Sequence, residues 1–198
     1  PWCLLAMTAI RPAAFAGRFY PGSPGELEAS VRAYLAEAKI SEGPAAKAAE
    51  NQVPKAIIAP HAGYIYSGPV AANAYARLAP ARGRISRVVL LGPCHRVPVR
   101  GLALSGADAF ATPLGNVPLD KKTCAELALL PQVEVFDDSH ALEHSLEVHL
   151  PFLQVVLGSF ALVPLAVGDA TEAEVAEVLD RAWGGPETLI VVSSDLSH

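Results

Sequence analysis

The sequence predicts a single α/β domain in which a mostly parallel sheet carries helices on both faces. Short apolar runs of strand length alternate with segments of helical spacing, and this alternation is typical of a parallel sheet. The runs are continuously apolar, as expected of strands buried on both faces. With 198 residues, of which 52% are hydrophobic, the chain is long enough for one sizeable core.

The elements follow from local signals taken in order. Ser67 is placed to cap a helix with Pro69 in its first turn, and Thr171 caps a later helix that has acidic residues near its start. Residues 39–54 indicate a surface connection, and residues 110–118 are rich in turn formers. The predicted strands are residues 56–59, 87–91, 101–104, 133–136, 160–167 and 188–193. The first predicted helix begins at Ser23 or Pro24, and the others cover residues 69–78, 120–130, 150–157 and 172–183.

Composition excludes several classes of protein. Charged residues make up 18% of the chain and the net charge is −5, which argues against a nucleic-acid-binding face. No apolar run reaches the roughly 18 residues of a membrane-spanning helix, so no membrane association is expected. Three widely spaced cysteines suit a reducing cytoplasm better than a disulfide framework.

The first ten residues are expected to be an N-terminal extension. They are apolar at the start but lack the basic residues and the length of a signal peptide. Met7 is the only methionine and a candidate natural start. The predicted domain therefore runs over residues 11–198.

Three histidines follow apolar strands within a few residues. His61 comes after the first predicted strand, His95 after the second, and His198 after the last. Open α/β sheets bind ligands beyond the carboxyl ends of their strands, which share one edge when the strands are parallel. With His61 and His95 on strands predicted to be adjacent, we expect a shared metal or substrate site, the alternative being two loop histidines bonded to backbone.

The residue types indicate the chemistry of such a site. Imidazole suits zinc, copper or iron, and two histidines with one carboxylate leave positions open on ferrous iron. Glu147 and Asp195 are the candidate carboxylates, and His198 is a candidate general acid or base because its ordinary pKa is near neutrality.

A polar patch at residues 137–149 contains three of the six histidines. If it is helical, His140, His144 and Glu147 share one face while His149 points elsewhere. The alternative is a solvated helix start, and Pro151 makes one continuous helix doubtful. Tyr64 and Tyr66 either form the wall of a pocket for a flat substrate or pack on the sheet.

Four motifs together resemble the Memo-like family, which includes the AmmeMemoRadiSam system protein B. They are Pro-His-Ala-Gly-Tyr at 60–64, Gly-Pro-Cys-His at 92–95, Glu-His-Ser-Leu-Glu-Val-His-Leu-Pro at 143–151 and Ser-Ser-Asp-Leu-Ser-His at 193–198. The segment Gly-Arg-Phe-Tyr-Pro at 17–21 fits as well. The resemblance covers nearly the whole chain from about Arg11.

The resemblance implies a fold similar to class III extradiol ring-cleaving dioxygenases, which use non-haem ferrous iron. It also implies a third metal-site residue, a cysteine well downstream, so the domain is expected to be truncated at its C-terminus. Cys94 stands where the animal proteins have a serine and is not taken as that ligand. By resemblance, the metal ligands are His61 and His95, the acid or base is His198, and the positions around the pocket are His144, Glu147, His149 and Asp195. Apart from the resemblance, Tyr64 is a candidate for shaping this pocket.

The leading expectation is a metal-binding redox protein or dioxygenase-like enzyme that uses iron or copper, with zinc also possible. The first alternative is a non-catalytic adaptor that binds a peptide or a metabolite in the same pocket. A zinc hydrolase is the second. In each case the expected ligand is a small molecule or a peptide.

Overall fold

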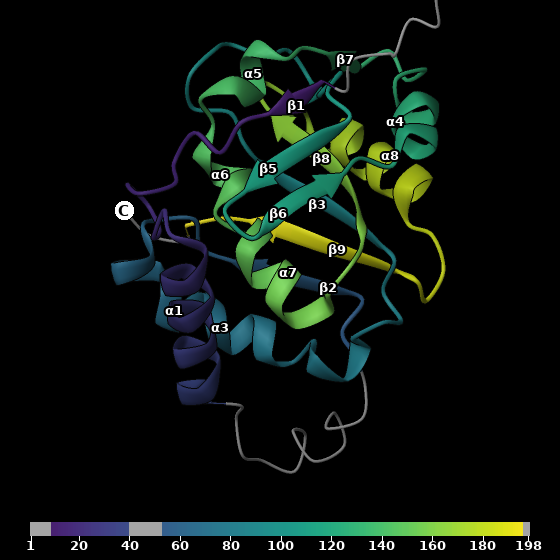
Figure 1. Ribbon diagram of the computed structural model, residues 1–198. Helices are drawn as coiled ribbons and strands as arrows, with labels where there is room; N and C mark the ends of the chain where they lie inside the picture. Colours follow the sequence, from purple (N-terminus) through teal and green to yellow (C-terminus); the bar gives the residue numbers. More distant parts are fainter. Residues whose placement is uncertain (1–8, 40–52, 196–198) are drawn as a thin grey trace, which may run out of the picture.

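The computed structural model describes residues 9–39 and 53–195, which form a layered α/β structure around a six-stranded sheet (Figure 1). The strand order is β2-β9-β3-β8-β4-β7, and every pairing is parallel except that of β4 with β8. The mostly parallel sheet is therefore confirmed. The strands are β2 (Ala56–Ala59), β3 (Arg87–Pro93), β4 (Leu102–Leu104), β7 (Val133–Val135), β8 (Ala161–Val167) and β9 (Thr188–Ser193).

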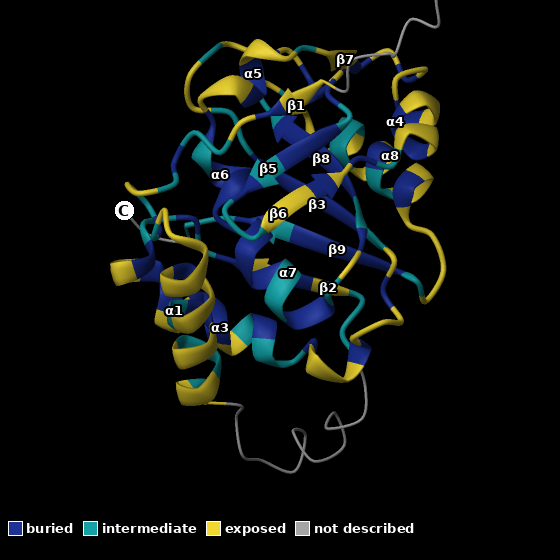
Figure 2. Cartoon of the chain, in the orientation of Figure 1, coloured by how far each residue is buried: buried dark blue, intermediate teal, exposed yellow. Residues whose placement is uncertain are grey.

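Helices cover both faces of this sheet, as predicted. On one face α1 (Pro24–Glu37), α3 (Tyr64–Ala76) and α7 (Leu150–Leu157) share a hydrophobic core with the strands. On the other, α4 (Lys121–Leu127) and α8 (Glu172–Ala182) form a second core. The central strands β3, β8 and β9 are buried, whereas the edge strands β2 and β7 and the outer helix surfaces are partly exposed (Figure 2). The expectation that residues 56–59 are buried on both faces is therefore wrong, because β2 is an edge strand. Within residues 9–39 and 53–195 no helix is long and apolar enough to cross a bilayer.

A second, three-stranded sheet was not predicted. It consists of β1 (Ile10–Arg11), β5 (Ala109–Thr112) and β6 (Gly115–Pro118), in the order β1-β5-β6. The turn formers at 110–118 belong to a tight hairpin, because β5 and β6 pair antiparallel across two residues. Phe110 and Val117 point from this hairpin into the core shared with α1, α3 and α7.

The helix after β2 begins earlier than predicted. The sequence indicated residues 69–78, whereas α3 starts at Tyr64, so Pro69 lies inside the helix. Ser67 is therefore not a cap, and its Oγ instead donates to the carbonyl of Ala62 at 2.6 Å. After α3 the chain continues through a 3₁₀ turn, η1 (Ala79–Ala81).

The polar patch at 137–149 is not one helix. It forms two short helices, α5 (Asp138–Ala141) and α6 (His144–Glu147), before α7 begins with Pro151 in its first turn. Glu143 has extended backbone, with φ −103° and ψ 126°, and separates α5 from α6. The shared helical face predicted for His140, His144 and Glu147 is therefore absent.

Candidate metal centre

Three side chains lie just beyond the carboxyl ends of parallel strands. His61 follows β2, His95 follows β3 and Asp195 follows β9. The strands that carry the two histidines are not adjacent, contrary to the sequence prediction, because β9 lies between them. The imidazole rings nevertheless meet, with centroids 5.3 Å apart. Asp195 holds this arrangement by accepting a hydrogen bond from the backbone N–H of His61 at 2.8 Å.

His144 from α6 completes a cluster of three imidazoles. Its ring centroid lies 5.5 Å from that of His61 and 4.8 Å from that of His95. One nitrogen from each ring lies within 4.8 Å of the other two. The sequence assigned His144 to the surroundings of the pocket, whereas the structure places it among the potential ligands.

Hydrogen bonds determine which nitrogens of His61 and His95 are free. The Oγ of Ser193 donates to the carbonyl of Ser145 at 2.6 Å, so it accepts from His61 Nδ1–H at 2.7 Å. The carboxylate of Glu143 accepts from His95 Nδ1–H at 2.9 Å. With both Nδ1 atoms protonated, the Nε2 lone pairs remain for a ligand, as in metal sites where an outer partner fixes the tautomer.

Burial governs the charge of these groups. Loss of water lowers the pKa of His61 and of His144, which favours the neutral rings that metals require. Burial by itself would raise the pKa of Glu143, but hydrogen bonds from His95 N, His95 Nδ1 and Ser145 N outweigh it and hold that pKa below its usual value. The site therefore combines two imidazoles whose neutral form is favoured, those of His61 and His144, with one buried carboxylate.

The environment of His144 is consistent with a ligand role. Its Nδ1 is buried and has no hydrogen-bond partner among the described residues. Its ring packs against Phe19 and Phe15, with centroids 4.7 Å and 5.5 Å away. An unsatisfied buried nitrogen costs about 1–3 kcal/mol, and a cation bound by the ring would offset this cost.

The donor set fits a transition-metal ion. Histidine nitrogens that bind one zinc ion at about 2.0–2.1 Å in tetrahedral geometry lie about 3.4 Å apart. The three nitrogens lie within 4.8 Å of one another, so the rings need to approach by up to about 1.4 Å to share an ion. Three imidazoles suit zinc, copper or iron, and leave coordination positions open.

A cavity of about 510 Å³ lies against this cluster. Its polar side includes His61, His95 and Asp195, and the Oδ2 of Asp195 is 3.7 Å from His61 Nε2. The opposite side is apolar and comes from the ends of the strands and from α8. This apolar lining comprises Leu91, Val167, Val175, Leu179 and Val192.

Glu147, predicted as a candidate carboxylate ligand, lies in a different network. It is fully buried and forms an ion pair with Arg11. Its oxygens also accept hydrogen bonds from the backbone N–H of Ala14 and Phe15 and from the hydroxyl of Tyr20, the last at 2.5 Å. This network attaches β1 and the following loop to α6, so Glu147 supports the segment that carries His144.

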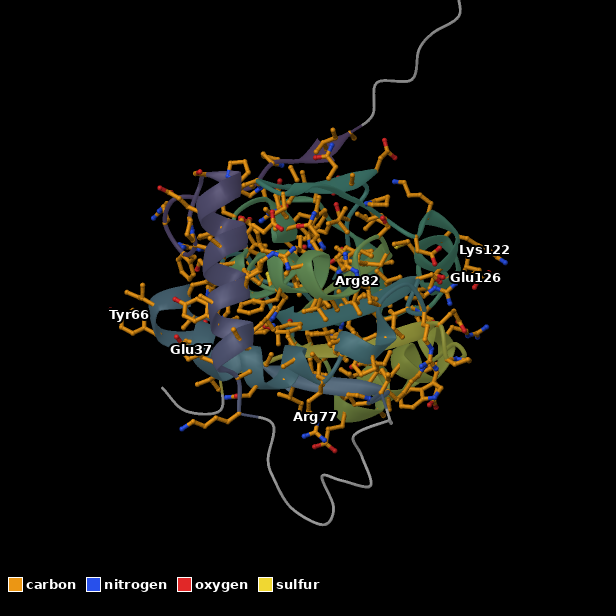
Figure 3. All side chains as sticks on the ribbon, turned by 60° about the horizontal axis from the view of Figure 1, so that its bottom comes forward. Glu37, Tyr66, Arg77, Arg82, Lys122 and Glu126 are labelled. Atoms are coloured by element: carbon orange, nitrogen blue, oxygen red, sulfur yellow. The ribbon has the colours of Figure 1, made fainter. Side chains whose placement is uncertain are left out.

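Two other predicted pocket residues are committed to core contacts. His149 is buried, and its Nδ1 is 2.7 Å from the hydroxyl of Tyr75, while its Nε2 has no partner among the described residues. Tyr64 is buried and its hydroxyl donates to the carbonyl of Val148 at 2.7 Å. Tyr66 is 76% exposed and points outward (Figure 3). His198 lies outside the described residues.

Glu143 and Ser193 were not predicted as site residues. Ser193 orients the ring of His61 and Glu143 orients the ring of His95, each through the Nδ1 atom of the histidine. Both residues lie inside the family motifs, and Glu143 directly precedes His144. Acidic residues and serines next to histidines are common in loops, so adjacency alone gave no reason to select them.

Comparison with known proteins identifies the family. A model described as Memo-like protein matches residues 11–198. The chain belongs to the Memo-like family. It is 35% identical over 198 residues to Protein MEMO1 of Homo sapiens and to Protein MEMO1 of Danio rerio. Each of these alignments covers 95% of this chain and 62% of the relative. It is 39% identical over 197 residues to a MEMO1 family protein of Thermotoga petrophila, covering 95% of this chain and 70% of that protein.

The motifs used for the prediction all lie inside the matched range, so the predicted resemblance to the Memo-like family is confirmed. The chain spans 62% of the length of the animal MEMO1 proteins it matches. The names of these relatives state no reaction, metal or substrate.

Proposed function

We propose that this Memo-like chain binds one transition-metal ion, iron or copper, through His61, His95 and His144. The observation that carries the proposal is the convergence of three imidazoles from β2, β3 and α6, with one nitrogen of each within 4.8 Å of the others. The outer hydrogen bonds to His61 and His95 support it, because they leave the Nε2 atoms as acceptors. Zinc also fits this donor set.

We further propose that the bound ion serves redox chemistry on a small molecule in the adjacent cavity. Bound iron or copper would supply a centre that activates oxygen or exchanges single electrons. The cavity supports a ligand with an apolar body, which the lining from β3, β8, β9 and α8 would hold. Asp195 is the side chain placed to accept a proton from the end of the ligand nearest His61, and His198 remains the proposed acid or base.

A cytoplasmic location is part of the proposal. Cys94 and Cys124 are both free thiols, which suits a reducing compartment. Burial raises the pKa of the Cys124 thiol to about 11, so this cysteine stays protonated.

Metal binding is tested on the purified chain after removal of metal by a chelator. Calorimetric titration with Fe²⁺, Cu²⁺ and Zn²⁺ is expected to give one site per chain. His61→Ala, His95→Ala and His144→Ala should each abolish stoichiometric binding. His140→Asn is the matched control, because His140 is a buried histidine whose Nε2 is engaged by the carbonyl of Ala103. Equal binding by the control and the cluster variants would refute the metal centre.

Oxygen uptake separates the possible activities. With Fe²⁺ supplied, consumption of oxygen in the presence of catechols would support the dioxygenase-like reaction. Hydrolysis with Zn²⁺ and no oxygen uptake would instead favour a hydrolase. Ligand binding in the cavity without turnover would favour the adaptor that captures a peptide or a metabolite.

A further inference from the structure

Glu143 is a buried carboxylate whose contacts converge on two members of the histidine cluster. It is 1% exposed. Its oxygens accept from the backbone N–H of His95 at 2.6 Å and from His95 Nδ1 at 2.9 Å, and Oε1 is 3.4 Å from His144 Nδ1. Its bond from the N–H of Ser145, at 2.9 Å, caps α6. The cap explains the contact with Ser145, and two of the other three contacts are with imidazole nitrogens.

The charge of Glu143 has no permanent counterion among the described residues. Its ion-pair partners within 4 Å are His95 and His144, and neither lysine nor arginine is one of them. Glu147, in the helix that Glu143 caps, provides a comparison, because it is equally buried but is neutralised by Arg11. A buried carboxylate without a cation is costly. A cation held by the imidazoles would supply the missing positive charge.

Resting on the proposed metal centre, we propose that Glu143 is a positioning residue that also makes this centre prefer divalent over monovalent cations. It holds His95 by one hydrogen bond from the backbone N–H and one from the ring Nδ1, and it places one negative charge beside two of the three imidazoles. Coulomb attraction is proportional to the charge of the ion. Removing the carboxylate charge therefore costs a divalent ion twice as much binding free energy as a monovalent ion. The fold-loss in affinity for the divalent ion is then the square of the fold-loss for the monovalent ion.

Copper can be tested both as a divalent ion, Cu²⁺, and as a monovalent ion, Cu⁺. Affinities of the wild-type chain and of Glu143→Gln are measured for Cu²⁺ in air and for Cu⁺ under nitrogen, each by competition with a chromogenic chelator. Loss of an outer-shell carboxylate is expected to weaken Cu²⁺ binding about 10- to 100-fold. Cu⁺ binding is then expected to weaken about 3- to 10-fold, the square root of the divalent loss. The Cu²⁺/Cu⁺ potential would rise by about 59 mV for each tenfold difference between the two losses.

Ser193→Ala is the matched control. It removes the acceptor for His61 Nδ1–H without changing charge, so it is expected to weaken Cu²⁺ and Cu⁺ binding by the same factor. Should Glu143→Gln fail to fold, as judged by circular dichroism, Glu143→Asp keeps the charge and shortens the side chain. That variant is expected to lose affinity equally for both ions and to retain the wild-type preference.

Equal losses for the two copper states in Glu143→Gln would overturn the charge role. Unchanged affinities would overturn the positioning role as well. A loss of divalent preference in Glu143→Asp would equally count against the proposal. Failure of the wild-type chain to bind either ion would overturn the metal centre itself, and this outcome is distinct because it appears before any substitution.

Discussion

Acidification from pH 7 to pH 5 should destabilise the metal-free chain through two buried histidines. Burial lowers the pKa of His149 to about 3 and that of His140 to about 4. In the unfolded chain both rings recover a pKa of about 6.5. Below that pH the unfolded state binds protons that the folded state does not, so stability is complete above about pH 6.5 and is lost as the pH falls toward 4.

The size of the loss follows from the two pairs of pKa values. Integrated between pH 7 and pH 5, each ring contributes about 1.9 kcal/mol, so the free energy of unfolding should fall by about 3.7 kcal/mol. His61 and His144 act in the same direction, because burial also lowers their pKa values. Most carboxyl groups titrate below this window, with ordinary pKa values of about 4.

Urea unfolding of chelator-treated protein at pH 7, 6 and 5 measures this dependence. His149→Gln keeps a hydrogen-bonding group for the Tyr75 hydroxyl but cannot take up the proton, so the contribution of about 1.9 kcal/mol from this ring should disappear. A free energy of unfolding that stays constant between pH 7 and pH 5, or a variant with the wild-type pH dependence, would refute the reasoning.

Three further predictions, one of them with a control substitution, test packing and capping elsewhere in the fold. Arg11→Met leaves the carboxylate of Glu147 buried without its cation and should cost about 3–5 kcal/mol in urea unfolding; a loss below 1 kcal/mol would contradict this. Gly101→Ala combines φ +78° with a Cβ only 2.1 Å from the carbonyl of Gln132, whereas Gly83→Ala has φ +74° and open space. The first should therefore lower the free energy of unfolding by at least about 2 kcal/mol more than the second, and equal losses would show that the clash is relieved. Thr171→Ala removes the capping box of α8 and should lower the free energy of unfolding by about 1 kcal/mol. An unchanged free energy of unfolding would contradict a stabilising role for this cap.

The sequence was sufficient for the layered α/β fold because its signals are local. The apolar runs that became β3, β8 and β9 are buried on both sides, and continuous apolar runs of strand length predict such strands. The Thr171 cap lies where the sequence placed it, with its oxygen accepting from the N–H of Glu174. The positions of His61 and His95 beyond strand ends followed from the same local signals.

Tertiary contacts decided which side chains surround the cluster. The extended backbone at Glu143 separates His140 in α5 from His144 in α6, and only His144 approaches His61 and His95. Glu147 turns away because Arg11, more than 130 residues earlier in the chain, supplies its counterion. Periodicity reports the exposure of a residue within its own element, whereas a partner this distant is set by the packing of whole elements. The sequence thus determined the edge of the sheet where the histidines gather, and only the folded chain determined which residues pair there.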